Sequence, residues 1–141
     1  VIPFVFIGLH LLARPGDARR CTQREAQAVI IRNLAREYSK QGRQVIITGD
    51  FNDNDEEALG LDRRLPKGAT LKILHDHGRF MNCASLIPEE ERYSCWFDAN
   101  QNCRLDGPDE RVMIDHLLMS GDWRPCITDV RIHHEWIPTC T

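Results

Sequence analysis

Two short apolar runs separated by a segment of helical periodicity are the feature that most constrains the fold of this chain. Residues 4–12 are almost continuously apolar, interrupted by Gly8 and His10, and residues 45–48 (Val-Ile-Ile-Thr) form a second, β-rich run. Continuous apolar character is typical of strands covered on both faces. The sequence therefore predicts a βαβ-like unit within an α/β fold, with residues 4–12 as a central strand.

The segment between the two runs predicts one long helix. Residues 22–25 (Thr-Gln-Arg-Glu) fit a capping box, and Gly42 stands where a left-handed C-cap is expected. We therefore expect a helix over residues 23–41. Its apolar side chains recur at helical spacing, which predicts a buried face formed by Ala26, Ile30, Leu34 and Tyr38.

The rest of the chain gives weaker patterns. Residues 93–97, 112–120 and 127–136 are each expected to form a strand, whereas residues 54–88 allow no detailed prediction. At 141 residues we expect one domain or part of one, and the apolar opening suggests a piece of a longer protein. The net charge of −3 predicts no global attraction for nucleic acid and does not identify a substrate. No apolar run is long enough for a transmembrane segment, and the oligomeric state is left open.

Six cysteines are many for a chain of this size, and none forms a Cys-x-x-Cys pair of the zinc or thioredoxin kind. We therefore expect most of them to be oxidised and the protein to be extracellular or in the secretory compartment. Sequence alone leaves the disulfide pairing open.

Three polar motifs end or interrupt the apolar strands, where open α/β sheets usually place ligand-binding groups. They are His10 with its leucine neighbours, residues 49–53 (Gly-Asp-Phe-Asn-Asp) and residues 113–116 (Met-Ile-Asp-His). Each could instead be structural, as a satisfied core histidine or as a capped turn. Asp115 is harder to explain in that way, because a buried carboxylate needs a partner.

Together and in this order, the three motifs resemble the endonuclease/exonuclease/phosphatase superfamily. The resemblance includes the helix start at residues 24–27 (Arg-Glu-Ala-Gln) and covers most of the chain, with residues 54–88 least supported. It implies a deoxyribonuclease-like α/β sandwich in which two sheets pack face to face and helices cover the outside. It also implies metal-dependent hydrolysis of a phosphate ester, most simply a phosphodiester.

The resemblance assigns catalytic roles to four residues. Asp50 would orient or deprotonate the attacking water, and Asn52 would donate to the phosphate. His10 would contact the scissile phosphate, and Asp115 would orient a catalytic histidine. Mg²⁺ is implied as the catalytic ion. The substrate could be a nucleic acid, a phospholipid or a small phosphate ester.

The family pattern is incomplete here, because its metal-binding Asn and Glu precede the His-Leu strand and its Ser-Asp-His motif follows the last strand. The chain is therefore expected to be one incomplete domain, residues 1–141, with little activity alone. His116 stands where the family often has an aromatic residue, which indicates a structural variant. His133 and His134 are interpreted as structural, because adjacent residues of a strand point to opposite faces.

A second metal signal lies in residues 98–110. Oxygen-bearing side chains occupy loop positions 1, 3, 5, 9 and 12, with a backbone carbonyl at position 7, which resembles the calcium loops of dockerins. Cys103 replaces the usual Gly at position 6, and Glu110 is an alternative last ligand. The alternative function is therefore a non-catalytic, secreted calcium-binding domain. The expected Ca²⁺ ligands are Asp98, Asn100, Asn102, Arg104 (through its carbonyl), Asp106 and Asp109.

Overall fold

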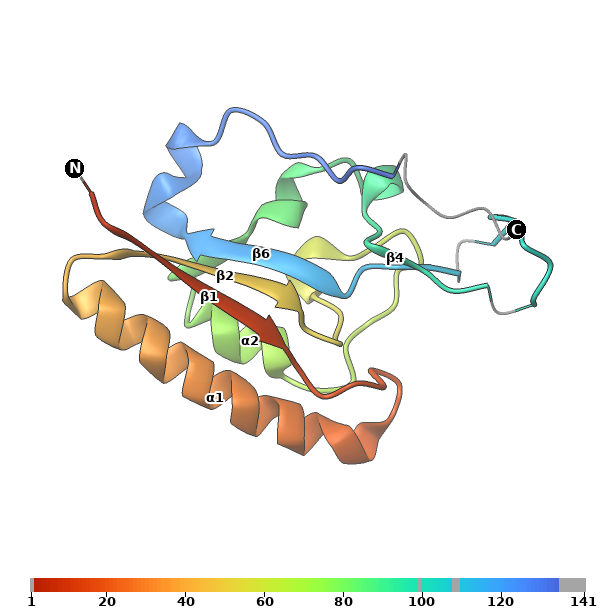
Figure 1. Cartoon of the computed structure of the whole chain (residues 1–141), viewed down its shortest axis with the longest axis horizontal. Coiled ribbons are helices and arrows are strands. Elements are labelled where there is room, and N and C mark those ends of the chain that lie inside the picture. The colour runs from red at the N-terminus through yellow and green to blue at the C-terminus, as the bar shows by residue number, and fades with distance from the viewer. Residues whose placement is uncertain (1, 99, 108–109, 135–141) are drawn as a thin grey trace.

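The computed structural model describes residues 2–98, 100–107 and 110–134. Its main sheet has four strands in the order β1-β2-β6-β3 (Figure 1). Strands β1 (Phe4–His10) and β2 (Gln44–Asp50) are parallel, whereas β6 (Asp115–Ser120) runs antiparallel to β2 and to β3 (Phe80–Asn82). The predicted α/β class is confirmed, since a helix connects β1 to its parallel neighbour β2.

Helices α1 (Ala18–Lys40) and α2 (Thr70–His75) lie on one side of the sheet. A second, two-stranded sheet, β4 (Cys95–Trp96) with β5 (Arg111–Val112), extends away from it. Short 3₁₀ helices complete the described elements: η1 (Glu56–Ala58), η2 (Cys83–Leu86), η3 (Glu89–Glu91) and η5 (Gly121–Cys126). None of the described helices has the length and apolar character needed to cross a bilayer.

The main core lies between the sheet and the two helices. Val45, Ile47 and Leu118 from the sheet pack with Ala28 and Ala35 from α1 and with Leu71 and Leu74 from α2. A smaller cluster gathers Ala58, Ala84, Ile87 and Met113. These two clusters support the end of β2 and the start of β6. The polar motifs at these strand ends are therefore held in place by a packed core.

Strand β1 is not the central strand that its apolar run predicts. It lies at the edge of the main sheet, and its side chains alternate between half-buried and exposed. Val5, Ile7 and Leu9 pack against the core, whereas Phe6 is 70% exposed on the opposite face. The apolar pattern therefore marks a strand with two apolar faces, of which the described structure covers one.

Helix α1 begins earlier than the capping box predicts. Asp17 is the N-cap and accepts a hydrogen bond from the Arg19 N–H, so Thr22 lies inside the helix and is exposed. The predicted C-terminal signal is correct, because Gly42 follows the helix at φ +74°. The predicted buried face is wrong at three of its four positions, since Ala26 is exposed and Ile30 and Leu34 are 69% and 43% exposed, whereas Tyr38 packs against the core. The buried positions of α1 are instead Cys21, Arg24, Ala28 and Ala35.

Two strand predictions near the C-terminus also need correction. Residues 112–120 form two strands rather than one, with a break at residues 113–114 where the chain passes from the small sheet to the main sheet. Residues 127–134 form no strand, because Val130 and Ile132 pack against the smaller core cluster instead. Residues 135–136 of that prediction lie outside the described residues.

Most of the six cysteines were expected to form disulfides, and this is contradicted for four of them. Cys21, Cys83, Cys95 and Cys126 are free thiols. Cys21 illustrates the reason, because it is buried within the α1 interface, where its Sγ lies 3.5 Å from Nη2 of Arg24. Burial also raises the pKa of the Cys83 thiol to about 11. Cys21 and Cys83 are buried packing residues, and the four free thiols give no support for secretion.

The buried alanines of α1 give a test of the corrected helix face. Ala28 is fully buried, so Ala28→Leu should overpack the core and destabilise the protein by about 1–3 kcal/mol. Ala26→Leu on the same helix is the matched control and should change stability by less than about 0.5 kcal/mol, because Ala26 is exposed. Urea unfolding measures both. Equal effects at the two positions would contradict the observed helix face.

Candidate active site

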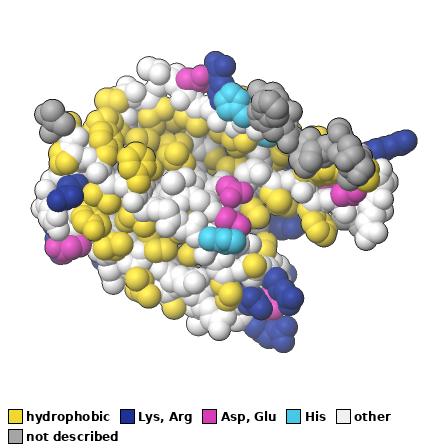
Figure 2. Space-filling model, viewed as in Figure 1, with side chains coloured by type: hydrophobic (Ala, Val, Ile, Leu, Met, Phe, Trp, Pro, Cys, Tyr) yellow, Lys and Arg dark blue, Asp and Glu magenta, His cyan; other side chains and the backbone are white. Residues whose placement is uncertain are grey.

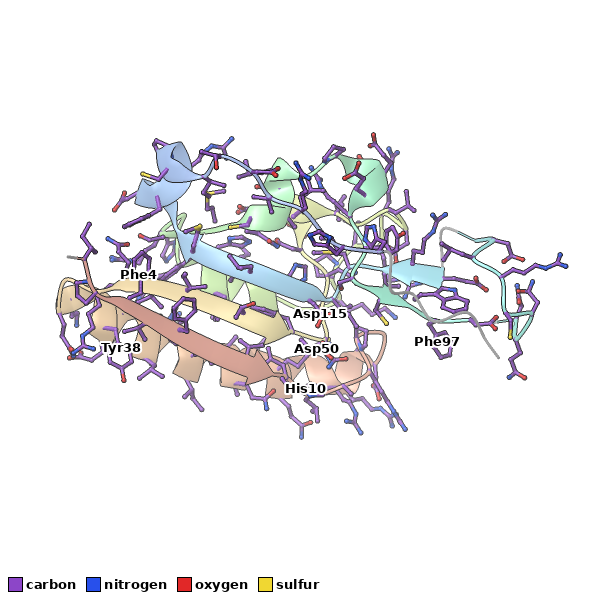
Figure 3. All side chains as sticks on the ribbon, turned by 45° about the horizontal axis from the view of Figure 1, so that its top comes forward. Phe4, His10, Tyr38, Asp50, Phe97 and Asp115 are labelled. Atoms are coloured by element: carbon purple, nitrogen blue, oxygen red, sulfur yellow. The ribbon has the colours of Figure 1, made fainter. Side chains whose placement is uncertain are left out.

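Strand pairing brings three of the four predicted catalytic residues into one row. His10 ends β1 and pairs with Asp50 at the end of β2, which in turn pairs with Asp115 at the start of β6. Figure 3 shows the three side chains close together at this edge of the sheet. Nε2 of His10 lies 3.3 Å from Oδ2 of Asp50. The row of His10, Asp50 and Asp115 is called the catalytic row below.

Asn52, the fourth predicted residue, lies beside the catalytic row. Its backbone N–H donates to Oδ1 of Asp50 at 2.8 Å, and its own φ is +49°. Its side-chain amide donates to the Leu11 carbonyl at 3.1 Å, and the residue is only 6% exposed. Because an amide group carries two N–H donors, one more remains for another acceptor. Asn52 thus fixes one oxygen of Asp50 and is itself fixed by the segment that follows β1.

Gly49 explains why a glycine precedes Asp50. Its φ is +136°, and a Cβ at this position would lie 2.0 Å from the Leu9 carbonyl oxygen. Any larger residue would therefore push β1 and β2 apart at the point where His10 meets Asp50. Gly49 thus allows β1 and β2 to approach closely, and this approach positions the carboxylate of Asp50 next to His10.

Asp115 is half-buried and has a carboxylate neighbour. Burial, and next to it the charge of Asp50, raise the pKa of Asp115, although a hydrogen bond with Ser94 opposes the rise. The Ser94 hydroxyl oxygen accepts from the N–H groups of Ile114 (3.1 Å) and Asp115 (2.9 Å). Sequence reasoning missed Ser94, since no local pattern links it to a strand that begins about twenty residues later. Beside Asp115, a hollow of about 500 Å³ opens between β6, η2 and residues 130–133.

Behind the catalytic row, a buried arginine holds the loop that follows β1. Arg24 on α1 is fully buried and donates to the carbonyl oxygens of Leu12 (3.3 Å), Arg14 (3.2 Å) and Pro15 (3.4 Å). Its Nε also lies 3.5 Å from Oδ2 of Asp53. The loop after His10 and the segment after Asp50 are therefore tied to the same guanidinium.

A buried polar network supports the same segment from the side of α2. His75 binds both oxygens of Asp55 through Nε2 at 2.9–3.0 Å and lies 2.9 Å from the Phe80 carbonyl through Nδ1. Burial disfavours charge on His75, yet the hydrogen bond and charge of Asp55 outweigh it and raise the pKa of His75 to about 9. For Asp55, burial alone would raise the pKa, but His75 holds it below its usual value. The two side chains form a buried ion pair.

His116 belongs to this network and has the structural place expected for it. The amide of Asn82 donates to Nδ1 of His116 at 2.9 Å, so Nε2 carries the proton that is donated to the Asp53 carbonyl at 3.0 Å. Burial lowers the pKa of His116 and keeps the ring neutral. Its ring also packs edge-on against Phe51. His134 is structural as well, since it stacks on Tyr93 with ring centroids 3.7 Å apart.

The described residues alone do not form the predicted Mg²⁺ site. Among them, no group of three or more His, Cys, Asp or Glu side chains is placed to hold a metal ion. The catalytic row supplies two carboxylates and a histidine on one edge, which is an incomplete donor set for Mg²⁺. The assignment of Mg²⁺ as the catalytic ion therefore stays a prediction.

The expected calcium loop closes on itself through its polar side chains. Oδ1 of Asp98 accepts from the Asn102 N–H (3.1 Å) and Oδ2 from the Cys103 N–H (2.8 Å). Asp106 accepts from the amides of Asn100 and Asn102 at 3.3 and 2.6 Å. Cys103, at the position where calcium loops use Gly, has φ +59°. Asp109 lies outside the described residues, and calcium binding stays a prediction.

Comparison with known proteins agrees with this geometry. Residues 1–137 match the sequence model of the Endonuclease/Exonuclease/phosphatase family. The chain belongs to this family. Enzymes of this family are in general phosphodiesterase- or nuclease-type hydrolases that use divalent metals such as Mg²⁺ and act on nucleic-acid or phosphate-ester substrates.

Among solved structures, the chain is similar to truncated Caenorhabditis elegans TDP2, with a TM-score of 0.51 and 20% sequence identity. The match covers 85% of this chain and 42% of the TDP2 chain. At this identity the similarity supports the fold, and the chain spans less than half the length of that neighbour. No curated protein matches the chain.

The buried ion pair predicts a pH dependence of stability. The folded pKa of His75, about 9, exceeds the unfolded value of 6.5, so its contribution is complete below pH 6.5 and is lost as the pH rises through 9. His116 acts oppositely, because its folded pKa is lowered and protonation of the unfolded state costs stability below pH 6.5. Stability should therefore be highest near pH 6.5. Urea unfolding across this range measures it.

The variant His75→Gln should destabilise the protein and remove much of the loss between pH 6.5 and 9. His77→Gln is the matched control on an exposed side chain and should keep the wild-type slope. If His75→Gln leaves the slope unchanged, His75 is not the charged partner of Asp55.

Proposed function

We propose that the complete protein hydrolyses a phosphodiester and that the catalytic row, together with Asn52, forms one part of its active site. The observation that carries the proposal is the strand register. Residues that come from three separate sequence motifs meet in adjacent positions, His10 opposite Asp50 and Asp50 opposite Asp115. A core-only role would not require a histidine and two carboxylates at one open edge.

The geometry supports a role for each side chain. Asp50 has one oxygen occupied by the Asn52 N–H and the other directed toward His10, so it can orient a water and accept its proton. Asn52 keeps one amide N–H for a phosphoryl oxygen. The His10 side chain is 73% exposed and can reach a phosphate placed over the row.

Asp115 fits the role of positioning residue. Asp115 is half-buried beside Ser94 and Asp50. In this place its carboxyl group can accept a hydrogen bond from a histidine of another part of the longer protein and hold that histidine in one tautomer. The chain alone is therefore expected to be nearly inactive, since it supplies only one part of the proton-transfer and metal-binding groups. The substrate class remains open among nucleic acids, phospholipids and small phosphate esters, and secretion stays a proposal.

The proposal predicts large kinetic effects in the complete protein. Asp50→Asn, Asn52→Ala and His10→Ala should each lower kcat by about 10²–10³, because each removes a group that acts on the water or on the phosphate. Turnover of DNA, of a nucleotide diester and of sphingomyelin with Mg²⁺ measures the effect, and melting curves check the fold. Asn33→Ala on the exposed face of α1 is the matched control for Asn52.

Wild-type kcat in Asp50→Asn would reduce the family relationship to a shared fold. Robust turnover by the present chain alone, lost in Asp50→Asn, would show instead that the chain contains a complete active site.

The loop of residues 98–110 favours a second candidate function, structural binding of Ca²⁺. Its carboxylates Asp98 and Asp106 both accept hydrogen bonds from Asn102, Asp98 from the backbone N–H and Asp106 from the side-chain amide, and like charges held together are relieved by a cation. The loop connects β4 to β5, and β5 leads directly to Asp115, so an ordered loop would fix where β6 begins. On its own, this site would suit a non-catalytic calcium-binding domain.

Calcium should raise the melting temperature of the chain. A ligand that binds only the folded state adds about 2.7 kcal/mol at a hundred times its dissociation constant. Mg²⁺ should do less, because it demands a tighter octahedral site. Asp98→Ala should abolish the shift, whereas Asp129→Ala, at an exposed aspartate elsewhere, should preserve it. Calorimetric titration without heat of binding, together with unshifted melting, would show that the loop is an ordinary polar connection.

A further inference from the structure

The loop that leaves β1 gathers basic side chains beside the catalytic row. Arg19 donates to both oxygens of Asp17, at 3.2 Å through Nε and 3.3 Å through Nη2, and the charges of Arg20 and Arg14 act on the same carboxylate and help to hold its pKa below its usual value. Lys67 joins them from a distant part of the sequence, because its Nζ donates to the Gly16 carbonyl at 2.9 Å. Figure 2 shows basic side chains around an acidic one on the same face as the histidine and the carboxylates at the centre of the view. Arg14, Arg19, Arg20 and Lys67 are called the basic rim below.

Hydrogen bonds hold the backbone of the loop after β1, which carries Arg14. Arg24 anchors the loop through the carbonyl oxygens of Leu12, Arg14 and Pro15, and Gln27 accepts from the Leu12 N–H at 3.2 Å. These contacts use backbone atoms, so the side chain of Arg14 is not needed for them. A fixed loop lowers the entropy lost when its side chains bind an anion.

Charge on the basic rim is only partly neutralised. Arg19 pairs with Asp17 at 3.2 Å, whereas the Arg14 and Lys67 side chains are exposed. Glu25, the acidic side chain that α1 turns toward this region, is engaged by the Ala69 N–H at 2.8 Å. Three arginines therefore act on the carboxylate of Asp17, and Lys67 adds a fourth positive charge to the rim, within a chain whose net charge is −3. A local attraction for anions exists here although the whole chain has none.

We propose that the substrate is a nucleic-acid strand that binds at two places. Its scissile phosphate lies at the catalytic row, and another phosphate of the same strand binds to the basic rim. This proposal rests on the proposed function and narrows its substrate class to nucleic acid. Arg14 follows His10 by four residues, so their Cα atoms are at most about 14 Å apart. Each strand of DNA carries a phosphate about every 3.4 Å along its axis. A phosphate a few nucleotides from the scissile one therefore falls within reach of the rim.

A substrate with a single phosphate would not use both places. A phospholipid head group or a small phosphate ester that fills the catalytic row leaves the rim without a ligand. A nucleic-acid strand engages both, and its salt-dependent contacts with Lys and Arg carry no sequence requirement. The basic rim would thus position the nucleic-acid strand, whereas the catalytic row and Asn52 act on the scissile bond.

Binding of a fluorescein-labelled single-stranded DNA oligonucleotide to the present chain, followed by fluorescence anisotropy, tests the rim without needing turnover. Arg14→Glu combined with Arg20→Glu should weaken binding at least about tenfold at low salt. The slope of log K against log salt should become shallower by about 1.4, since each lost phosphate contact removes about 0.7. Lys40→Glu combined with Arg43→Glu carries the same charge change at the opposite end of the sheet and should bind like wild type.

Equal affinities of the rim variant and the control would overturn the proposal, as would an unchanged salt slope. Rim-dependent binding of phosphatidylserine vesicles without binding of the oligonucleotide would overturn the nucleic-acid assignment and make the rim a membrane contact. Arg14→Gln with Arg20→Gln repeats the test if the charge-reversed variant unfolds. The rim is tested by the oligonucleotide affinity of the present chain and the proposed function by the turnover of the complete protein, so the failure of one is distinguishable from the failure of the other.

Discussion

The close approach of β1 and β2 at Gly49 is the constraint on which the rest of the site depends. The Leu9 carbonyl occupies the space of a Cβ at Gly49, so the two strands are held at one distance and in one register. That register places His10 opposite Asp50, and the antiparallel pairing of β2 with β6 extends the row to Asp115. A slip of one residue would turn one of these side chains to the core face. A single backbone contact thus decides whether three distant motifs meet.

The buried guanidinium of Arg24 shows how the sequence compensates for an unusual core. A buried charge is costly unless it is paired and hydrogen-bonded, and Arg24 donates to three carbonyl oxygens and is paired in charge, though not hydrogen-bonded, with Asp53. The same contacts hold the loop after His10 and the segment after Asp50. The arginine is therefore retained in the α1 interface because it links the backbone near both motifs, a task that an apolar side chain of similar volume could not perform.

Local patterns predicted the parts of this structure that local forces determine. The strands around His10 and Asp50, the left-handed Gly42 and the α/β class follow from apolar runs and turn residues. The buried face of α1 did not follow, because a cysteine, an arginine and two alanines form it while Ile30 and Leu34 face outward. Ser94 and the His75–Asp55 pair were also missed, since their partners are distant in sequence and only the folded chain brings them together. The predicted catalytic roles themselves came from family resemblance and remain to be tested.

The distribution of cations among the carboxylates indicates which of them can perform chemistry. Asp53 is paired with Arg24, Asp55 with His75 and Asp76 with Arg36. By contrast, Asp50 faces His10 and the Asn52 N–H, and Asp115 faces Ser94. Burial, and next to it the charge of Asp50, raise the pKa of Asp115, and neither carboxylate has an arginine or lysine as a described partner. Within one short segment, Asp53 and Asp55 therefore stabilise the fold, whereas Asp50 remains available to a water, a phosphate or a cation.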